Sequence, residues 1–210
     1  MHGSLRELMH GTDRGPRVQL SAAVGPATVA VGAVAHLAGE ISALDGRVYV
    51  SAPDGAGGTA TTAEAGDVAA ALLVHADVRT WQPVPLKTPV DPAGLADAVE
   101  AALRDAGFDV EQAIPIRMRG GLREVAWHVI DGARLEGTGH AAHRRSGPHG
   151  VFESVEGARV GFFSRHHPGV FTHMNERLHL HLIREVPVPL TAHVDGAGLA
   201  SGVVLEAGLP

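Results

Sequence analysis

The sequence contains no cysteine, and this absence excludes several kinds of chemistry. Disulfide bonds, thiolate catalysis and cysteine-ligated zinc sites are all ruled out. Aromatic residues make up only 4% of the chain, so valine, leucine and alanine must supply most of the core. The net charge of −6 has the wrong sign for binding nucleic acid or an anionic membrane surface, and we expect neither partner.

Long hydrophobic runs are also lacking. No stretch reaches the roughly 20 apolar residues that a membrane-spanning helix needs, and residues 1–18 lack the layout of a signal peptide. We therefore expect a soluble, cytoplasmic protein. Apolar residues make up 45% of the 210 residues, which is enough for one sizeable core or two closely packed subdomains.

Histidine is the residue present in excess, with 14 in the chain. Leucine and histidine alternate from Leu178 to Ile183, a period of two that predicts a β-strand. His179 and His181 then lie on one face, about 6–7 Å apart, and can bind one metal ion. His193 follows a Pro-Val-Pro break and could approach on a neighbouring strand. Three histidines leave open coordination positions, which is typical of catalytic metal sites.

One segment predicts a helix with clear boundaries, over residues 91–106. Asp91 is a good N-cap, the next residue is a proline suited to the first helical position, and Gly107 is a natural stop. The apolar stripe consists of Leu95, Val99 and Leu103. We expect this helix to be structural and to carry no chemistry.

Most other segments predict strands. Asp45-Gly46 predicts a tight hairpin turn, and a second hairpin is expected to join residues 151–155 to residues 158–164. In the strand over 122–130, His128 lies opposite the apolar face. Residues 66–78 are apolar and predict a helix or a buried segment.

Two polar segments contain further histidines. Residues 137–150 are interpreted as a solvated loop, and residues 166–176 as a second loop that leads into the His179 strand. Among the loop histidines, His166, His167 and His173 are the candidates for additional contacts to a metal.

Several motifs, taken in order, resemble the α-acetolactate decarboxylase family. That family has a Gly-Thr-Phe-x-x-Leu-x-Gly-Glu stretch followed by an Asp-Gly turn, then Gly-x-x-Val-Gly-Phe, Tyr-His-Leu-His-Phe-Ile and Gly-Gly-His-Val. The corresponding segments here are 32–40 with 44–46, 157–162, 178–183 and 191–194. The resemblance extends over nearly the whole chain.

The resemblance implies an α/β protein of the α+β type with few helices. An N-terminal mixed β-sheet (residues 1–112, with the helix near 91–106) would pack against a C-terminal antiparallel β-sheet (residues 113–210). A zinc ion (Zn2+) would lie between them, held by His179, His181 and His193. The family also implies a homodimer.

The implied activity is that of a lyase acting on a small 2-hydroxy-3-keto acid such as acetolactate. The zinc ion would chelate substrate oxygens and, as a Lewis acid, stabilise the enediolate left when CO2 departs. Glu40 matches the glutamate of the first motif and would return a proton to the carbanion-like carbon.

Three positions depart from the family pattern. Ala33 replaces a threonine, and His128 stands where the family has an arginine, whose bidentate grip on a carboxylate a histidine cannot reproduce. The chain also ends at Pro210, before the family's C-terminal glutamate, and Glu206 lies too early to match it. We interpret these changes as a different substrate or lost activity. His128 could serve as a replacement acid or base.

Two other classes of protein remain open. His179, His181 and Glu185 fit the start of a cupin motif, which would hold iron or manganese for a dioxygenase or an isomerase. The chain could also be a non-catalytic binding or regulatory protein on the decarboxylase scaffold.

Overall fold

The computed structural model describes residues 1–11, 13–63, 66–174 and 176–210. Two antiparallel β-sheets with few helices form its framework, which confirms the expected α+β class. The helices are α1 (Leu5–His10), α2 (Leu20–Ala23), α3 (Leu95–Asp105) and α4 (His140–Ser146), with 3-10 turns η1 (Ala35–Leu37), η2 (Pro92–Gly94) and η3 (Gly132–Arg134).

The first sheet has six described strands in the order β1-β6-β2-β3-β4-β5. They are β1 (Val18–Gln19), β2 (Thr28–Val34), β3 (Glu40–Leu44), β4 (Arg47–Pro53), β5 (Thr59–Thr62) and β6 (Ala69–Asp77). Every described pairing is antiparallel, so the expectation of a mixed sheet is wrong. Parallel neighbours need long crossovers, whereas the short turn between β3 and β4 permits only an antiparallel pair.

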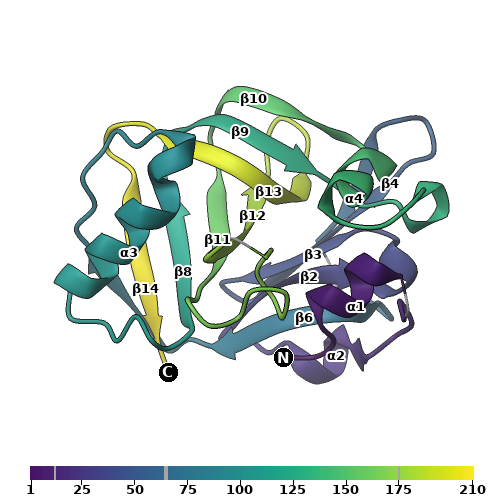
Figure 1. Ribbon diagram of the computed structural model, residues 1–210, viewed down its shortest axis with the longest axis horizontal. Helices are drawn as coiled ribbons and strands as arrows, with labels where there is room; N and C mark the ends of the chain where they lie inside the picture. The colour runs from purple at the N-terminus through teal and green to yellow at the C-terminus, as the bar shows by residue number, and fades with distance from the viewer. Residues whose placement is uncertain (12, 64–65, 175) are drawn as a thin grey trace.

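The second sheet has eight described strands in the order β10-β9-β13-β12-β11-β8-β14-β7. They are β7 (Thr80–Val84), β8 (Ile114–Arg119), β9 (Leu122–His128), β10 (His149–Val155), β11 (Ala158–Phe163), β12 (Leu178–Arg184), β13 (Leu190–Leu199) and β14 (Val204–Leu209). In Figure 1 this sheet lies beside the first one, and α3 covers its outer face.

Local signals predicted several elements well. Asp45 and Gly46 both adopt positive φ, 52° and 76°, in the turn between β3 and β4. Helix α3 begins after η2, and Gly107 follows it with φ +86°. The Asp91 side chain makes no capping hydrogen bond, because it accepts one from Arg123 at 2.5 Å.

Of two local predictions, one is partly confirmed and one is wrong, and the neighbouring strands explain both outcomes. Residues 66–78 contain the buried strand β6, which lies between β1 and β2 and is covered on both faces, so the expectation of a buried segment holds and the helical alternative does not. The predicted hairpin over 151–164 is absent from the described pairings. Strand β10 pairs with β9, whereas β11 pairs with β12 and β8.

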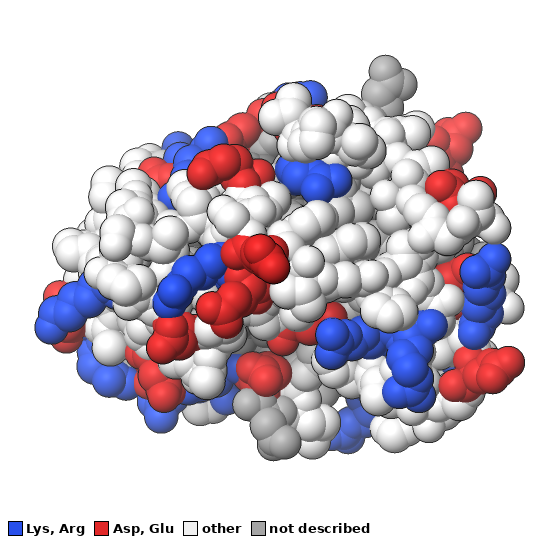
Figure 2. Space-filling view, turned by 90° about the horizontal axis from the view of Figure 1, so that it is seen from above, with Lys and Arg blue, Asp and Glu red and all other residues white. Residues whose placement is uncertain are grey.

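The described core has three apolar clusters, one on each face of the second sheet and a third on the outer face of the first sheet. One apolar cluster joins α3 to the outer face of the second sheet, and another fills the space between the two sheets. Strand β7 and helix α3 precede residue 113 in the chain but belong with the second sheet. On the face shown in Figure 2, acidic and basic side chains are interspersed, and neither sign covers the surface continuously.

Candidate metal centre

The three predicted metal ligands lie together between the two sheets. His179 and His181 project from the inner face of β12, and His193 lies directly opposite His181 on β13. The ring centroids of His179 and His181 are 5.2 Å apart. The centroid of His193 lies 5.2 Å from that of His179 and 5.6 Å from that of His181. One nitrogen of each ring lies within 4.8 Å of the others, and all three residues are buried.

Two of these buried rings have a nitrogen without a partner, which fits a metal ion. Neither His179 Nδ1 nor His181 Nε2 has a hydrogen-bond partner among the described residues. Burial lowers the pKa of His179 to about 4 and lowers the pKa values of His181 and His193 well below their usual range. The rings are therefore neutral near pH 7, the form of imidazole that binds metals.

Strand β3 supports the ring of His181 from the opposite sheet. Ser42 Oγ lies 3.2 Å from His181 Nδ1 and is also hydrogen-bonded to the hydroxyl of Thr191. A hydrogen bond at Nδ1 selects the tautomer that leaves the Nε2 lone pair for a metal ion. No sequence pattern predicts this contact, because Ser42 and His181 belong to different sheets.

Glu40, at the start of β3, is buried beside the histidines. Its Oε1 accepts a hydrogen bond from the Ile130 backbone N–H at 3.2 Å, and its Oε2 lies 3.7 Å from His181 Nε2. Desolvation raises the pKa of Glu40 well above its ordinary value, against the opposing effect of the Ile130 bond. Glu40 therefore holds a proton to higher pH than an exposed glutamate does.

His128, at the end of β9, lies directly opposite His193 on β13, with ring centroids 4.9 Å apart. Its Nδ1 lies 3.0 and 3.1 Å from the two carboxylate oxygens of Asp195. His128 lines one small cavity together with Glu40, His179 and His193. The structure thus brings all five predicted site residues together.

Three further residues complete the cluster, and of these the sequence had indicated only His173, as a candidate for an additional contact. His140 Nε2 lies 2.9 Å from Asp195 Oδ1, and His140 belongs to α4 within the segment expected to be a solvated loop. His173 Nε2 lies 3.3 Å from His193 Nε2. Asp195 could have been found, since it follows His193 by two positions in one strand. The positions of His140 and His173 depend on tertiary contacts alone.

The other candidates lie elsewhere. His166 pairs with the exposed Glu111, and His167 Nδ1 lies 2.7 Å from Ser164 Oγ. Glu185 accepts a hydrogen bond from Tyr49 and belongs to none of the metal-capable groups among the described residues, which counts against the cupin interpretation.

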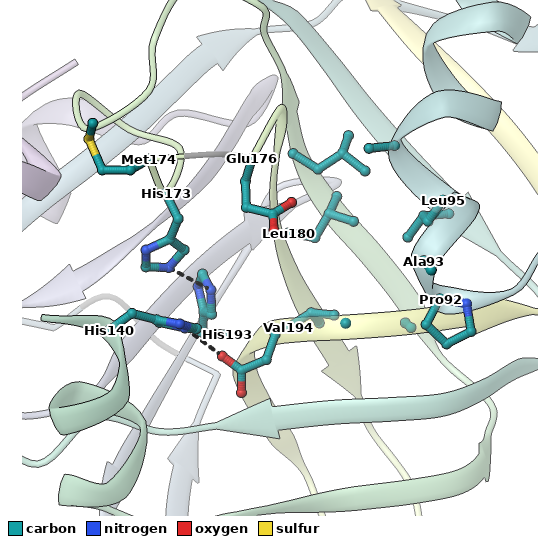
Figure 3. A pocket seen from close by; sticks show the side chains of 15 residues that line it. Pro92, Ala93, Leu95, His140, His173, Met174, Glu176, Leu180, His193 and Val194 are labelled. Carbon is teal, nitrogen blue, oxygen red and sulfur yellow. Dashed lines mark hydrogen bonds and ion pairs between the residues drawn. The ribbon is translucent and has the colours of Figure 1, made fainter.

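A cavity of about 350 Å³ opens beside the cluster. Figure 3 shows His140, His173 and His193 gathered at one end, and Pro92, Ala93 and Leu95 at the other, where the α3 segment begins. The walls that join these ends are largely apolar, so a small organic molecule with one polar end would fit the cavity.

The fold and the site define a class of protein, in which two antiparallel sheets enclose a buried cluster of histidines and carboxylates. The family model of alpha-acetolactate decarboxylase matches residues 1–203, and the chain belongs to that family. The family is one of metal-using decarboxylases, which are lyases. No curated protein sequence matches the chain significantly.

Solved structures show the same fold at low identity. Alpha-acetolactate decarboxylase from Bacillus subtilis strain 168 is 18% identical, with a TM-score of 0.69 over 99% of this chain and 84% of that one. The enzyme from Bacillus subtilis subspecies spizizenii is 16% identical, with a TM-score of 0.70 over 98% and 83%. A Staphylococcus aureus protein of unknown function, described as similar to alpha-acetolactate decarboxylase, is 16% identical, with a TM-score of 0.64 over 98% and 82%. No described helix has the length and apolar character needed to cross a membrane.

Proposed function

We propose that the protein is a zinc-dependent carboxy-lyase acting on a small 2-hydroxy-3-keto acid or a related carbonyl compound. The observation that supports this proposal is the convergence of three buried, neutral imidazoles beside a buried carboxyl group. His179, His181 and His193 would hold the metal. A bound metal would supply Lewis acidity that stabilises the negative charge left when CO2 departs.

Glu40 is the proposed proton donor. Its Oε1 is engaged by the Ile130 N–H, so a proton carried at Oε2 would face His181 and the metal site. The raised pKa of Glu40 keeps a larger share of the acid form available near neutral pH. Leu5, Leu37 and Ile130 line the same cavity and would exclude water from the reacting carbon.

The walls of the two cavities contain no lysine or arginine among the described residues that line them. A guanidinium close to the site is that of Arg144, whose Nε lies 3.4 Å from the Asp195 carboxylate. A substrate carboxylate would therefore lack a bidentate arginine contact. We expect acetolactate to be bound weakly by side chains alone, because its carboxylate would contact no lysine or arginine of the described cavity walls.

His128 has two possible roles in this site. Asp195 fixes its Nδ1, so the ring could transfer a proton from its other nitrogen, or the pair could instead bind a cation.

Metal analysis and CO2 release test the proposal together. We expect zinc in the purified protein, one ion per chain fewer in the His179→Ala/His181→Ala variant, and no change in the His166→Ala control. CO2 release from a panel of 2-hydroxy-3-keto acids should fall about 10²–10⁴-fold in Glu40→Gln, the usual contribution of a general acid. An unchanged metal content in the double variant would reject the metal site.

A non-catalytic binding protein is the second candidate. The apolar Ala33 beside Glu40 and the absence of a cation from the described cavity walls favour it. Metal binding without CO2 release from any acid of the panel would support this candidate. The homodimer remains an expectation from the family and the cytoplasmic location an expectation from the sequence; light scattering of the purified protein and fractionation of the source cells test them.

A further inference from the structure

A second group of ligands adjoins the three-histidine site and shares no residue with it. The group is His128 from β9, His140 from α4 and Asp195 from β13. Asp195 Oδ1 lies 3.0 Å from His128 Nδ1 and 2.9 Å from His140 Nε2. The side chain of Asp195 is 4% exposed, so this carboxylate meets the two imidazoles in a nearly dry environment.

These separations match those between ligands of one metal ion. Two bonds of about 2.0–2.1 Å at a tetrahedral angle place the ligand atoms about 3.3 Å apart. The two observed nitrogen–oxygen separations are slightly shorter, so small outward movements of both His128 and His140 relative to Asp195 would admit an ion.

We propose that His128, His140 and Asp195 form a second divalent-cation site. Two imidazoles and one carboxylate leave coordination positions open, and this ligand set suits zinc, iron(II) or manganese(II). The inference goes beyond the proposed function, which uses one metal ion. His173 lies between the two ligand groups, since its ring centroid is 4.1 Å from that of His140 and 5.1 Å from that of His193.

The second cation would add positive charge at the wall of the larger cavity, whose described lining residues include no lysine or arginine. His140 and Asp195 line the cavity of about 350 Å³, so the open coordination positions face the space that a substrate would occupy. An anionic group of the ligand, such as a carboxylate, would bind this ion in place of an arginine side chain. With His128 acting as a metal ligand, proton transfer falls to Glu40.

Metal stoichiometry tests the inference without an activity assay. The protein is stripped with a chelator, titrated with Zn2+, freed of excess metal and analysed for zinc per chain. We expect two ions in the wild type, one in Asp195→Ala and one in His140→Ala. The His179→Ala/His181→Ala variant should also retain one ion, and the control His166→Ala, an exposed histidine outside both groups, should retain two.

Cobalt(II) gives an independent readout, because its visible absorption reports the coordination of each ion. During titration with cobalt(II), the visible absorption of the wild type should rise in two phases, one for each site. The His140→Ala variant should lose one of these phases. The His140 side chain is 41% exposed, so this variant is expected to keep the fold, which circular dichroism checks. Two ions in Asp195→Ala or His140→Ala, or a single ion in the wild type, would overturn the inference. If the double variant retains two ions while Asp195→Ala loses one, the second site stands and the proposed function fails.

Discussion

Replacing Arg159 by methionine should stabilise the protein. Arg159 lies on β11 between Leu182 and Met118, in the apolar layer beneath α3, and is fully buried. One terminal nitrogen, Nη2, lies 3.3 Å from the Gly198 carbonyl oxygen, to which it donates a hydrogen bond. Nε and Nη1 have no hydrogen-bond partner in the described part of the chain. The charge is thus buried with little compensation.

The magnitude follows from the pKa of Arg159. Burial lowers this pKa from 12.5 to about 9, and each tenfold change in proton affinity corresponds to about 1.4 kcal/mol. The difference of about 3.5 gives an upper bound of about 5 kcal/mol for the cost of the buried charge near pH 7. Replacing buried ionic groups with apolar side chains of similar volume often stabilises by about 1–4 kcal/mol. We expect a gain in that range for Arg159→Met.

Urea unfolding of both proteins at pH 7 and at pH 10, followed by circular dichroism, checks this prediction. The folded pKa lies below the unfolded one, so above pH 9 the unfolded chain binds more protons and the wild type gains stability as the pH rises. The advantage of the variant should therefore shrink from pH 7 to pH 10. The exposed control Arg134→Met should change stability by less than about 0.5 kcal/mol. A variant less stable than the wild type at pH 7, or an advantage independent of pH, would refute the reasoning.

Three further predictions concern the fold and the metal. Tyr49 is the only tyrosine, and burial, together with the Glu185 hydrogen bond, raises its pKa to about 12. Ultraviolet titration should show a phenol that ionises late in the wild type and at lower pH in Glu185→Gln. A phenol with an ordinary pKa in the wild type would contradict the structure. Leu103→Ala, in the buried stripe of α3, should lower the free energy of unfolding by about 2–5 kcal/mol, measured in urea, and a loss below about 1 kcal/mol would argue against this packing. Zinc at 100 times its Kd should stabilise the stripped protein by about 2.7 kcal/mol per site, measured as a rise in Tm, and the rise should be smaller in His179→Ala/His181→Ala.

Local pattern predicted those parts of the site that lie on regular strands. Alternation along 178–183 placed His179 and His181 on one face, and the structure bears this out because both project from the inner face of β12. The same rule placed His128 opposite the apolar face of its strand. It would also have placed Asp195 on the same face of its strand as His193. The motif order assigned Glu40 to the site, although its distance from His181 in sequence hides their contact.

The strand partners could not be predicted in the same way. Residues 151–164 have a strong turn signal, yet their two strands pair with β9 and with β8 and β12. Residues 66–78 are apolar on both faces, a pattern shared by buried helices and by central strands. Only the neighbours on either side of β6 decide between these alternatives.

The sequence by itself determined the periodic elements: the His179 strand, the Asp45-Gly46 turn and the 91–106 helix, each specified by neighbouring residues. The tertiary structure alone decided which groups surround the histidines. His140 and His173 lie in irregular or short segments with no periodicity to orient them, and contacts with β13 bring them to the cluster. Backbone geometry constrains side chains a few residues apart, whereas the site is assembled from strands and loops far apart in the chain, whose approach depends on the packing of both sheets.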